Sequence, residues 1–266
     1  MIFKVKELKK GYNFYKKNGY IIIEDDIFSK IKKKIEGEIF GIYLSLSKSN
    51  KKINLKNIVN YKSLLKYLIP LDSKLKLISI LYDLCPANPY ISTLHNQEIF
   101  LKIIKQLRIK KPLLGTMTGV RFDRPNDEKR NTAIHQDQWY SFLSDNALTI
   151  WFNLDVMEKS LGPLIVYPKT HLKKIYNFID NNKGTFDIRK KNLLPKEMEI
   201  KLQKNQILIF NQYLLHKSGN NVSDKPRVSL QIRYNDLSTQ KKFKSSFRCT
   251  TSQHVLDNQQ KYLKLN

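Results

Sequence analysis

The chain has 266 residues and a mass of 31.4 kDa, which suits one large domain with a sizeable core. The formal net charge is +25, but the lysines are scattered along the whole chain and no nucleic-acid-binding motif is present, so we interpret the charge as a lysine-rich surface and expect no nucleic-acid partner. The two cysteines, Cys85 and Cys249, exclude a disulfide scaffold or a zinc ribbon, and without a signal peptide or 18 consecutive apolar residues we expect a cytoplasmic protein that does not enter the membrane.

The first part of the chain, residues 1–113, has mostly the apolar periodicity of helices. A short apolar strand is predicted at 20–26, and proline residues are expected to stop two of the helices, at Pro70 and Pro86. We expect the helical segment 51–85 to cap the functional site. The predicted helices cover 8–20, 27–40, 54–70, 73–86 and 96–109, and Gly19 lies near the end of the first one.

The pattern changes near Leu114 to short runs of strand-forming residues separated by turn residues. Strands without long helices between them favour a sandwich or barrel over a doubly wound α/β fold. We therefore predict one domain over 1–266, mainly β with added helices, in which a helical part over 1–113 packs on a jelly-roll core over 114–240. The predicted strands cover 115–125, 132–140, 147–156, 162–170, 199–202, 206–216 and 227–236, with a lysine-rich insertion over 173–204.

Three residues in this β-rich part have the pattern of a metal site. His135 and Asp137 are two residues apart, so on a strand both side chains point to the same face. His216 ends a distant apolar run and can supply a third ligand. Two imidazoles and one carboxylate form the facial triad of non-haem iron(II) oxygenases, which leaves coordination positions open. A lone His-x-Asp pair is weak evidence, because buried polar residues often only satisfy hydrogen bonds.

The predicted strand 227–236 strengthens this hypothesis. Its alternation places Arg227, Ser229, Gln231 and Arg233 on one face and its apolar residues on the other. A buried guanidinium is costly unless an anion pairs with it, and its fork matches a carboxylate. We therefore expect Arg227 and Ser229 to bind the distal carboxylate of 2-oxoglutarate.

Four ordered blocks, which together span most of the chain, resemble the phytanoyl-CoA dioxygenase family of iron(II)- and 2-oxoglutarate-dependent oxygenases. The blocks are YKKNGYIIIEDDIFS, RFDRPNDEKRNTAIHQDQWY, LTIWFNLDVMEKSLGPLIVYPKTHLKK and QILIFNQYLLHKSGNNVSDKPRVSLQIRY. The resemblance implies a double-stranded β-helix, cupin-like, with Fe(II) as cofactor and 2-oxoglutarate and O2 as co-substrates. One departure is the loop of Pro168 to His171, where Lys169 stands at a position that is glycine in the family pattern.

Residue by residue, the resemblance implies His135, Asp137 and His216 as iron ligands and Arg227 as the anchor of the co-substrate. The other positions that match its pocket are Ser218, Trp151 and Met117. Next to the first ligands, we expect Gln136, Gln138, Trp139 and Tyr140 in the substrate wall, and Arg121 and Arg233 near an anionic substrate group. Three other histidines, His95, His171 and His254, are not expected to bind iron.

The expected reaction is hydroxylation of an unactivated C–H bond of a small or carrier- or CoA-linked substrate. The carboxylate of Asp137 favours hydroxylation, or another oxidation such as desaturation, over halogenation, because related halogenases have a small residue there. Each substrate-wall residue could equally serve packing or surface pairing. The alternative function is a binding or regulatory protein on the same fold that has lost turnover. The sequence does not identify the substrate or the oligomeric state.

Overall fold

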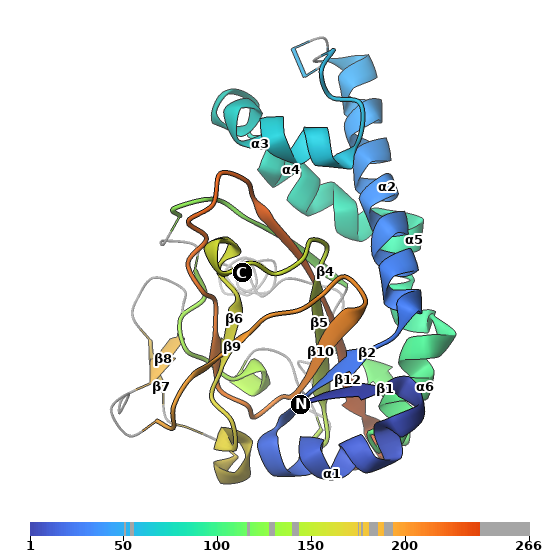
Figure 1. Ribbon diagram of the computed structural model, residues 1–266, viewed down its shortest axis with the longest axis vertical. Helices are drawn as coiled ribbons and strands as arrows, with labels where there is room; N and C mark the ends of the chain where they lie inside the picture. Colours follow the sequence, from blue (N-terminus) through green and yellow to red (C-terminus); the bar gives the residue numbers. More distant parts are fainter. Residues whose placement is uncertain are drawn as a thin grey trace, which may run out of the picture.

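The computed structural model describes residues 1–50, 52–53, 56–115, 118–127, 131–139, 144–174, 176, 178–180, 186–188 and 194–239 (Figure 1). A seven-stranded sheet, mostly antiparallel, forms its centre. The strand order is β1 (Ile2–Lys4), β2 (Tyr20–Glu24), β10 (Gln206–Asn211), β5 (Leu148–Asn153), β12 (Arg227–Asp236) and β3 (Pro112–Leu114), with β4 (Gly119–Asp123) also paired to β12.

A smaller sheet faces the large one in the β-rich part of the chain. Its three strands are β11 (His216–Lys217), β6 (Leu164–Val166) and β9 (Met198–Ile200). Within the predicted insertion 173–204, the hairpin β7 (Phe178–Asp180) and β8 (Phe186–Ile188) pairs separately, and β9 follows it. The side chains of Trp151, Leu208 and Phe210 from the large sheet and Leu164 and Val166 from the small one share a buried cluster, so the two sheets face each other.

Helices cover the outer face of the large sheet (Figure 1). They are α1 (Leu8–Asn18), α2 (Asp26–Ser49), α3 (Tyr61–Leu75), α4 (Leu77–Leu84), α5 (Pro89–Ser92) and α6 (Glu98–Gln106). Gly19 ends α1 in the left-handed conformation at φ 82°, which is accessible to glycine at little cost. None of the helices in the described ranges is long and apolar enough to cross a membrane.

The third helix differs from the prediction at both ends. Helix α3 begins at Tyr61, after a capping box formed by Asn60 and Ser63, and it continues through Pro70. A proline inside a helix costs about 3 kcal/mol. Leu68 and Leu71 on either side of it are buried in the core, and this packing keeps the helix intact. The chain instead turns at Lys76, which adopts φ 52° between α3 and α4.

The strand β12 separates the core from the inner face, as its alternation predicted. Val228, Leu230, Ile232 and Tyr234 pack into the main core with apolar side chains of α2, α3, α4 and α6. The expectation that segment 51–85 caps the site is wrong for its described residues, because the buried side chains of α3 and α4 join this core behind the sheet.

Candidate metal centre

The segment that carries the first two predicted ligands is not the regular strand that we predicted over 132–140. His135 forms an isolated antiparallel bridge with His216, through backbone N–O distances of 2.9 and 3.0 Å. A 3-10 turn over Asp137–Trp139 follows directly. The predicted strand 206–216 is also divided, since β10 ends at Asn211 and His216 begins β11 of the other sheet. The bridge sets the two histidines side by side.

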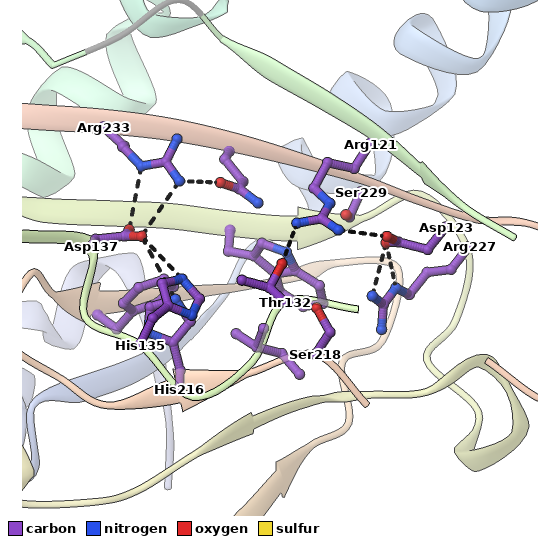
Figure 2. Close-up of a pocket in the computed structure, with 14 residues that line it drawn as sticks. Arg121, Asp123, Thr132, His135, Asp137, His216, Ser218, Arg227, Ser229 and Arg233 are labelled. Carbon is purple, nitrogen blue, oxygen red and sulfur yellow. Dashed lines mark hydrogen bonds and ion pairs between the residues drawn. The ribbon is translucent and has the colours of Figure 1, made fainter. Parts of the chain in front are cut away.

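The three predicted ligands converge in the described structure. Asp137 Oδ1 lies 3.7 Å from Nε2 of His135 and 3.7 Å from Nε2 of His216. The two imidazole centroids are 4.1 Å apart, and all three side chains are buried. One ligand atom from each residue lies within 4.8 Å of the others, and no other group of this kind occurs in the described ranges. The predicted ligand set is therefore assembled in one place (Figure 2).

Hydrogen bonds fix the tautomers of both imidazoles. Nδ1 of His135 lies 2.8 Å from the Ala133 carbonyl, and Nδ1 of His216 lies 3.0 Å from the Leu214 carbonyl. A carbonyl only accepts, so each Nδ1 carries a proton and each Nε2 is the nitrogen that faces the centre. Burial, and then the neighbouring His135, lower the pKa of His216 to about 3, so this ring is neutral. The donor set fits a divalent transition metal.

The carboxylate of Asp137 is ionised in this setting. Burial alone would raise its pKa, but the positive charge of Arg233, followed by the contacts with His135 and His216, holds the pKa well below its usual range. Arg233 Nε donates to Asp137 Oδ2 at 3.3 Å, and the hydroxyl of Thr149 donates to the same oxygen. No sequence pattern pointed to Thr149, because its contact with Asp137 depends on strand pairing.

A cavity of about 280 Å³ extends from the triad between the two sheets. Its apolar walls are Trp151, Leu164 and Phe210, and its polar walls include the inward face of β12, as the alternation predicted. Figure 2 shows the triad and Arg233 on one side of the cavity and Arg121, Asp123 and Arg227 on the other.

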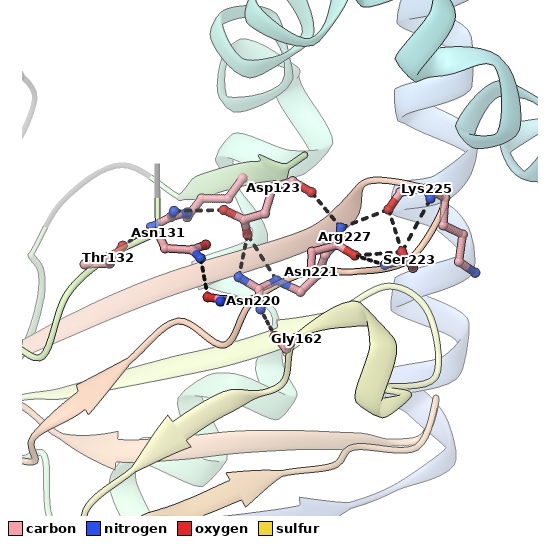
Figure 3. A network of polar contacts seen from close by, with 10 residues as sticks. Asp123, Asn131, Thr132, Gly162, Asn220, Asn221, Ser223, Lys225 and Arg227 are labelled. Carbon is pink, nitrogen blue, oxygen red and sulfur yellow. Dashed lines mark hydrogen bonds and ion pairs between the residues drawn. The ribbon is translucent and has the colours of Figure 1, made fainter. Parts of the chain in front are cut away.

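Asp123 joins two arginines at the far end of the cavity. Its carboxylate accepts from Arg227 Nε at 3.1 Å and Nη2 at 2.8 Å, and from Arg121 Nη2 at 2.8 Å. Arg227 Nη1 donates to the Gly162 carbonyl, and Asn221 Nδ2 donates to the backbone carbonyl of Asp123 at 3.0 Å (Figure 3). Burial would raise the pKa of Asp123, but Arg121 and Arg227 lower it. The guanidinium of Arg227 is thus held in one orientation.

Most of the predicted pocket residues reach this cavity, and two do not. The side chain of Gln136 is fully buried away from the cavity. Its amide nitrogen donates to the Lys174 and Tyr213 carbonyls and its amide oxygen accepts from the Tyr176 N–H, so its assignment to the substrate wall is wrong. Gln138 does not line the cavity either. The predicted residues that do line it are Trp151, Ser218, Arg227, Ser229, Arg121 and Arg233. The predictions for Met117, Tyr140, His254 and the side chain of Trp139 lie outside the described residues.

The loop of Pro168 to His171 lies apart from the metal centre. The ring of His171 packs against Gly19, and its Nε2 bonds the Lys16 carbonyl at 3.0 Å. Lys169 adopts φ 68°, the left-handed conformation in which glycine is favoured. The loop thus keeps its left-handed turn without the glycine, and neither His171 nor His95 joins the ligand group.

Solved structures with a similar fold include non-heme alpha ketoglutarate dependent enzymes. The non-heme alpha ketoglutarate dependent carbocyclase SnoK from nogalamycin biosynthesis is 14% identical, with a TM-score of 0.57 over 94% of this chain and 90% of that one. The epimerase SnoN, solved with Fe3+, alpha ketoglutarate and nogalamycin RO, is 15% identical, with a TM-score of 0.55 over 91% and 92%. EctD from S. alaskensis with bound Fe is 14% identical, with a TM-score of 0.53 over 91% and 80%. At these identities the likeness is one of fold.

No curated protein matches the chain in a sequence comparison. The family model described as phytanoyl-CoA dioxygenase (PhyH) matches residues 93–229, which is more than half of the chain and includes all three ligands and Arg227. With the assembled triad, this match shows that the chain belongs to the phytanoyl-CoA dioxygenase family of non-haem oxygenases.

Proposed function

We propose that the protein is an iron(II)- and 2-oxoglutarate-dependent dioxygenase that hydroxylates an unactivated C–H bond. The observation that carries the proposal is the convergence of two imidazole Nε2 atoms and one carboxylate oxygen in a buried site next to a cavity. The solved relatives with bound iron or alpha ketoglutarate support the choice of metal and co-substrate.

The proposed architecture follows from the same observations. We take the two facing sheets as a double-stranded β-helix, or jelly roll, over 114–240, with residues 1–113 packed on it in a single domain over 1–266. The shared core of helices and large sheet supports this division, since neither part buries its apolar face alone.

The bound metal would supply a site for O2, whose reduction is coupled to oxidative decarboxylation of 2-oxoglutarate to succinate and CO2. His135, Asp137 and His216 would hold it, with the imidazoles as neutral donors. Arg227 would bind the distal carboxylate of the co-substrate, with the hydroxyls of Ser218 and Ser229 as further donors to it. Asp123 fixes the direction of the guanidinium, and this pre-organisation lowers the entropy cost of binding.

The walls of the cavity exclude water and orient the co-substrate. Trp151 lines the cavity with the triad, and Met117 is proposed as a further pocket residue from the family resemblance alone. For the prime substrate, Arg121 and Arg233 line the cavity, and Trp139 and Tyr140 follow the first ligands in the chain. The relatives were solved with nogalamycin RO in one case and 5-hydroxyectoine in another, which favours a small-molecule substrate over a carrier-linked one.

A succinate-release assay tests the proposal. The protein would be loaded anaerobically with Fe(II) and then given 2-oxoglutarate, O2 and pools of candidate small molecules. We expect at least one pool to stimulate succinate release in wild type and in Asp224→Ala, an exposed acid away from the cavity, but not in Asp137→Ala. Iron and 2-oxoglutarate binding without succinate release in any pool would favour the non-catalytic alternative.

A further inference from the structure

The two carboxylate oxygens of Asp137 have different surroundings. Oδ1 faces Nε2 of both imidazoles, at 3.7 Å from each. Oδ2 points the other way, where it accepts a hydrogen bond from the Thr149 hydroxyl and another from Arg233 Nε at 3.3 Å. Arg233 Nη2 donates a longer hydrogen bond to Oδ1, at 3.5 Å. Figure 2 shows Arg233 on the side of Asp137 opposite to the histidines.

Both donors to Oδ2 come from strands of the central sheet. Thr149 lies on β5 and Arg233 on β12, and the two residues are direct partners in the antiparallel register. Strand β5 is flanked by β10 and β12, and Thr149 is fully buried. A donor on a central strand keeps its position, whereas Asp137 sits in a single 3-10 turn after an isolated bridge. The orientation of the carboxylate therefore depends on the strands.

We propose that Thr149 is a positioning residue of the metal centre, which together with Arg233 occupies Oδ2 so that Asp137 offers only Oδ1 to the metal. A carboxylate that binds through one oxygen leaves one more coordination position for the co-substrate and O2 than a carboxylate that binds through two. This inference rests on the proposed function, because it assumes that the triad holds a metal.

Thr149 acts on Asp137 through its hydroxyl, which donates to Oδ2. Thr149→Val keeps the shape of the side chain but removes its donor, which leaves Oδ2 with Arg233 alone. Residues that orient a metal ligand typically contribute 10- to 100-fold to metal affinity. Thr149→Ser keeps the hydroxyl and should restore the contact.

The experiment measures Co(II) binding by equilibrium dialysis of the metal-free protein, because Co(II) substitutes for iron(II) and resists oxidation in air. We expect the Kd of Thr149→Val to rise about 10- to 100-fold over wild type and that of Thr149→Ser to change less than about threefold. The visible Co(II) spectrum should change in Thr149→Val if Oδ2 becomes a second ligand. Thr118→Val is the matched control, since Thr118 is also buried and its hydroxyl has no hydrogen-bond partner in the described structure.

The outcomes separate the proposed metal site from the proposed role of Thr149. If wild type binds no Co(II), the metal site itself is wrong. If wild type binds Co(II) and Thr149→Val binds it equally well with the same spectrum, the site stands and the role of Thr149 is refuted. Should Thr149→Val fail to fold, Thr149→Cys replaces it, because a thiol of similar size is only a weak donor; equal affinity of the Cys and Ser variants would then refute the role.

Discussion

Replacing Arg227 by lysine tests how the co-substrate is held. Arg227 is buried and donates to Asp123 through Nε and Nη2 and to the Gly162 carbonyl through Nη1, so its plane is fixed. A lysine ammonium keeps the charge, but it lacks the planar guanidinium that Asp123 holds in place and that can bond the co-substrate carboxylate in a fixed direction. Asp123 would keep its bond to Arg121 at 2.8 Å, so we expect Arg227→Lys to fold.

The expected rise in KM follows from the loss of the hydrogen bond between Arg227 and the distal carboxylate of 2-oxoglutarate. A hydrogen bond to a charged group contributes about 1.5–3 kcal/mol, and its loss should raise the KM for 2-oxoglutarate roughly 10- to over 100-fold. We expect a smaller change in kcat at saturating 2-oxoglutarate.

Succinate release at varied 2-oxoglutarate measures both constants. Arg124→Lys is the matched control, because Arg124 pairs with Asp72 at 2.6 Å and does not line the cavity. The control should lose some thermal stability and keep the wild-type KM for 2-oxoglutarate. An Arg227→Lys variant with an unchanged KM would remove Arg227 from the co-substrate site.

Three further predictions follow from the geometry. His135→Ala, Asp137→Ala and His216→Ala should each abolish Fe(II) retention after anaerobic dialysis with the fold intact, and a variant with normal iron content would exclude that residue as a ligand. The unfolding free energy of the metal-free protein, measured by urea titration, should fall as the pH drops from 6.5 towards 3, because His216 of the unfolded chain then binds a proton that the folded His216 does not. His216→Gln should flatten this part of the curve of unfolding free energy against pH. An unchanged slope in that variant would contradict a neutral buried imidazole. Lys169→Gly should raise stability to thermal unfolding by about 0.5–1 kcal/mol by relieving the left-handed conformation at φ 68°, while Lys169→Ala should gain nothing; equal effects would show that the turn carries no strain.

The inward face of β12 could be predicted from sequence because a strand has a strict period of two. Arg227, Ser229, Gln231 and Arg233 all line the cavity, and the intervening apolar residues all join the core. The third ligand, His216, could also be found, because it follows an apolar run and precedes a basic strand. Here the local pattern and the tertiary structure agree.

The local geometry around Asp137 could not be predicted in the same way. The alternation of IHQD suggested a strand, but the chain forms one bridge and then a 3-10 turn. Two partners that are distant in sequence, Thr149 and Arg233, set the direction of the carboxylate, and only strand pairing brings them together. The same change of backbone turns Gln136 away from the cavity, towards the backbone of Tyr213.

Asp123 was missed for a related reason. It lies within the predicted strand 115–125, but its sequence neighbours Arg121 and Arg124 give no sign that it pairs with a distant arginine. Its partner Arg227 is adjacent only through the pairing of β4 with β12. A charged residue that pairs across strands leaves no periodic signal in a single sequence.

Anaerobic calorimetry of 2-oxoglutarate binding tests the central claim most directly. The claim is that His135, Asp137 and His216 hold one Fe(II), at which 2-oxoglutarate binds with its distal carboxylate on Arg227. We predict one 2-oxoglutarate per chain in the Fe(II)-loaded protein, and binding weakened at least tenfold in the metal-free protein and in Asp137→Ala. Equal 2-oxoglutarate affinity with and without Fe(II), or no retained iron in the wild-type protein, would contradict the account.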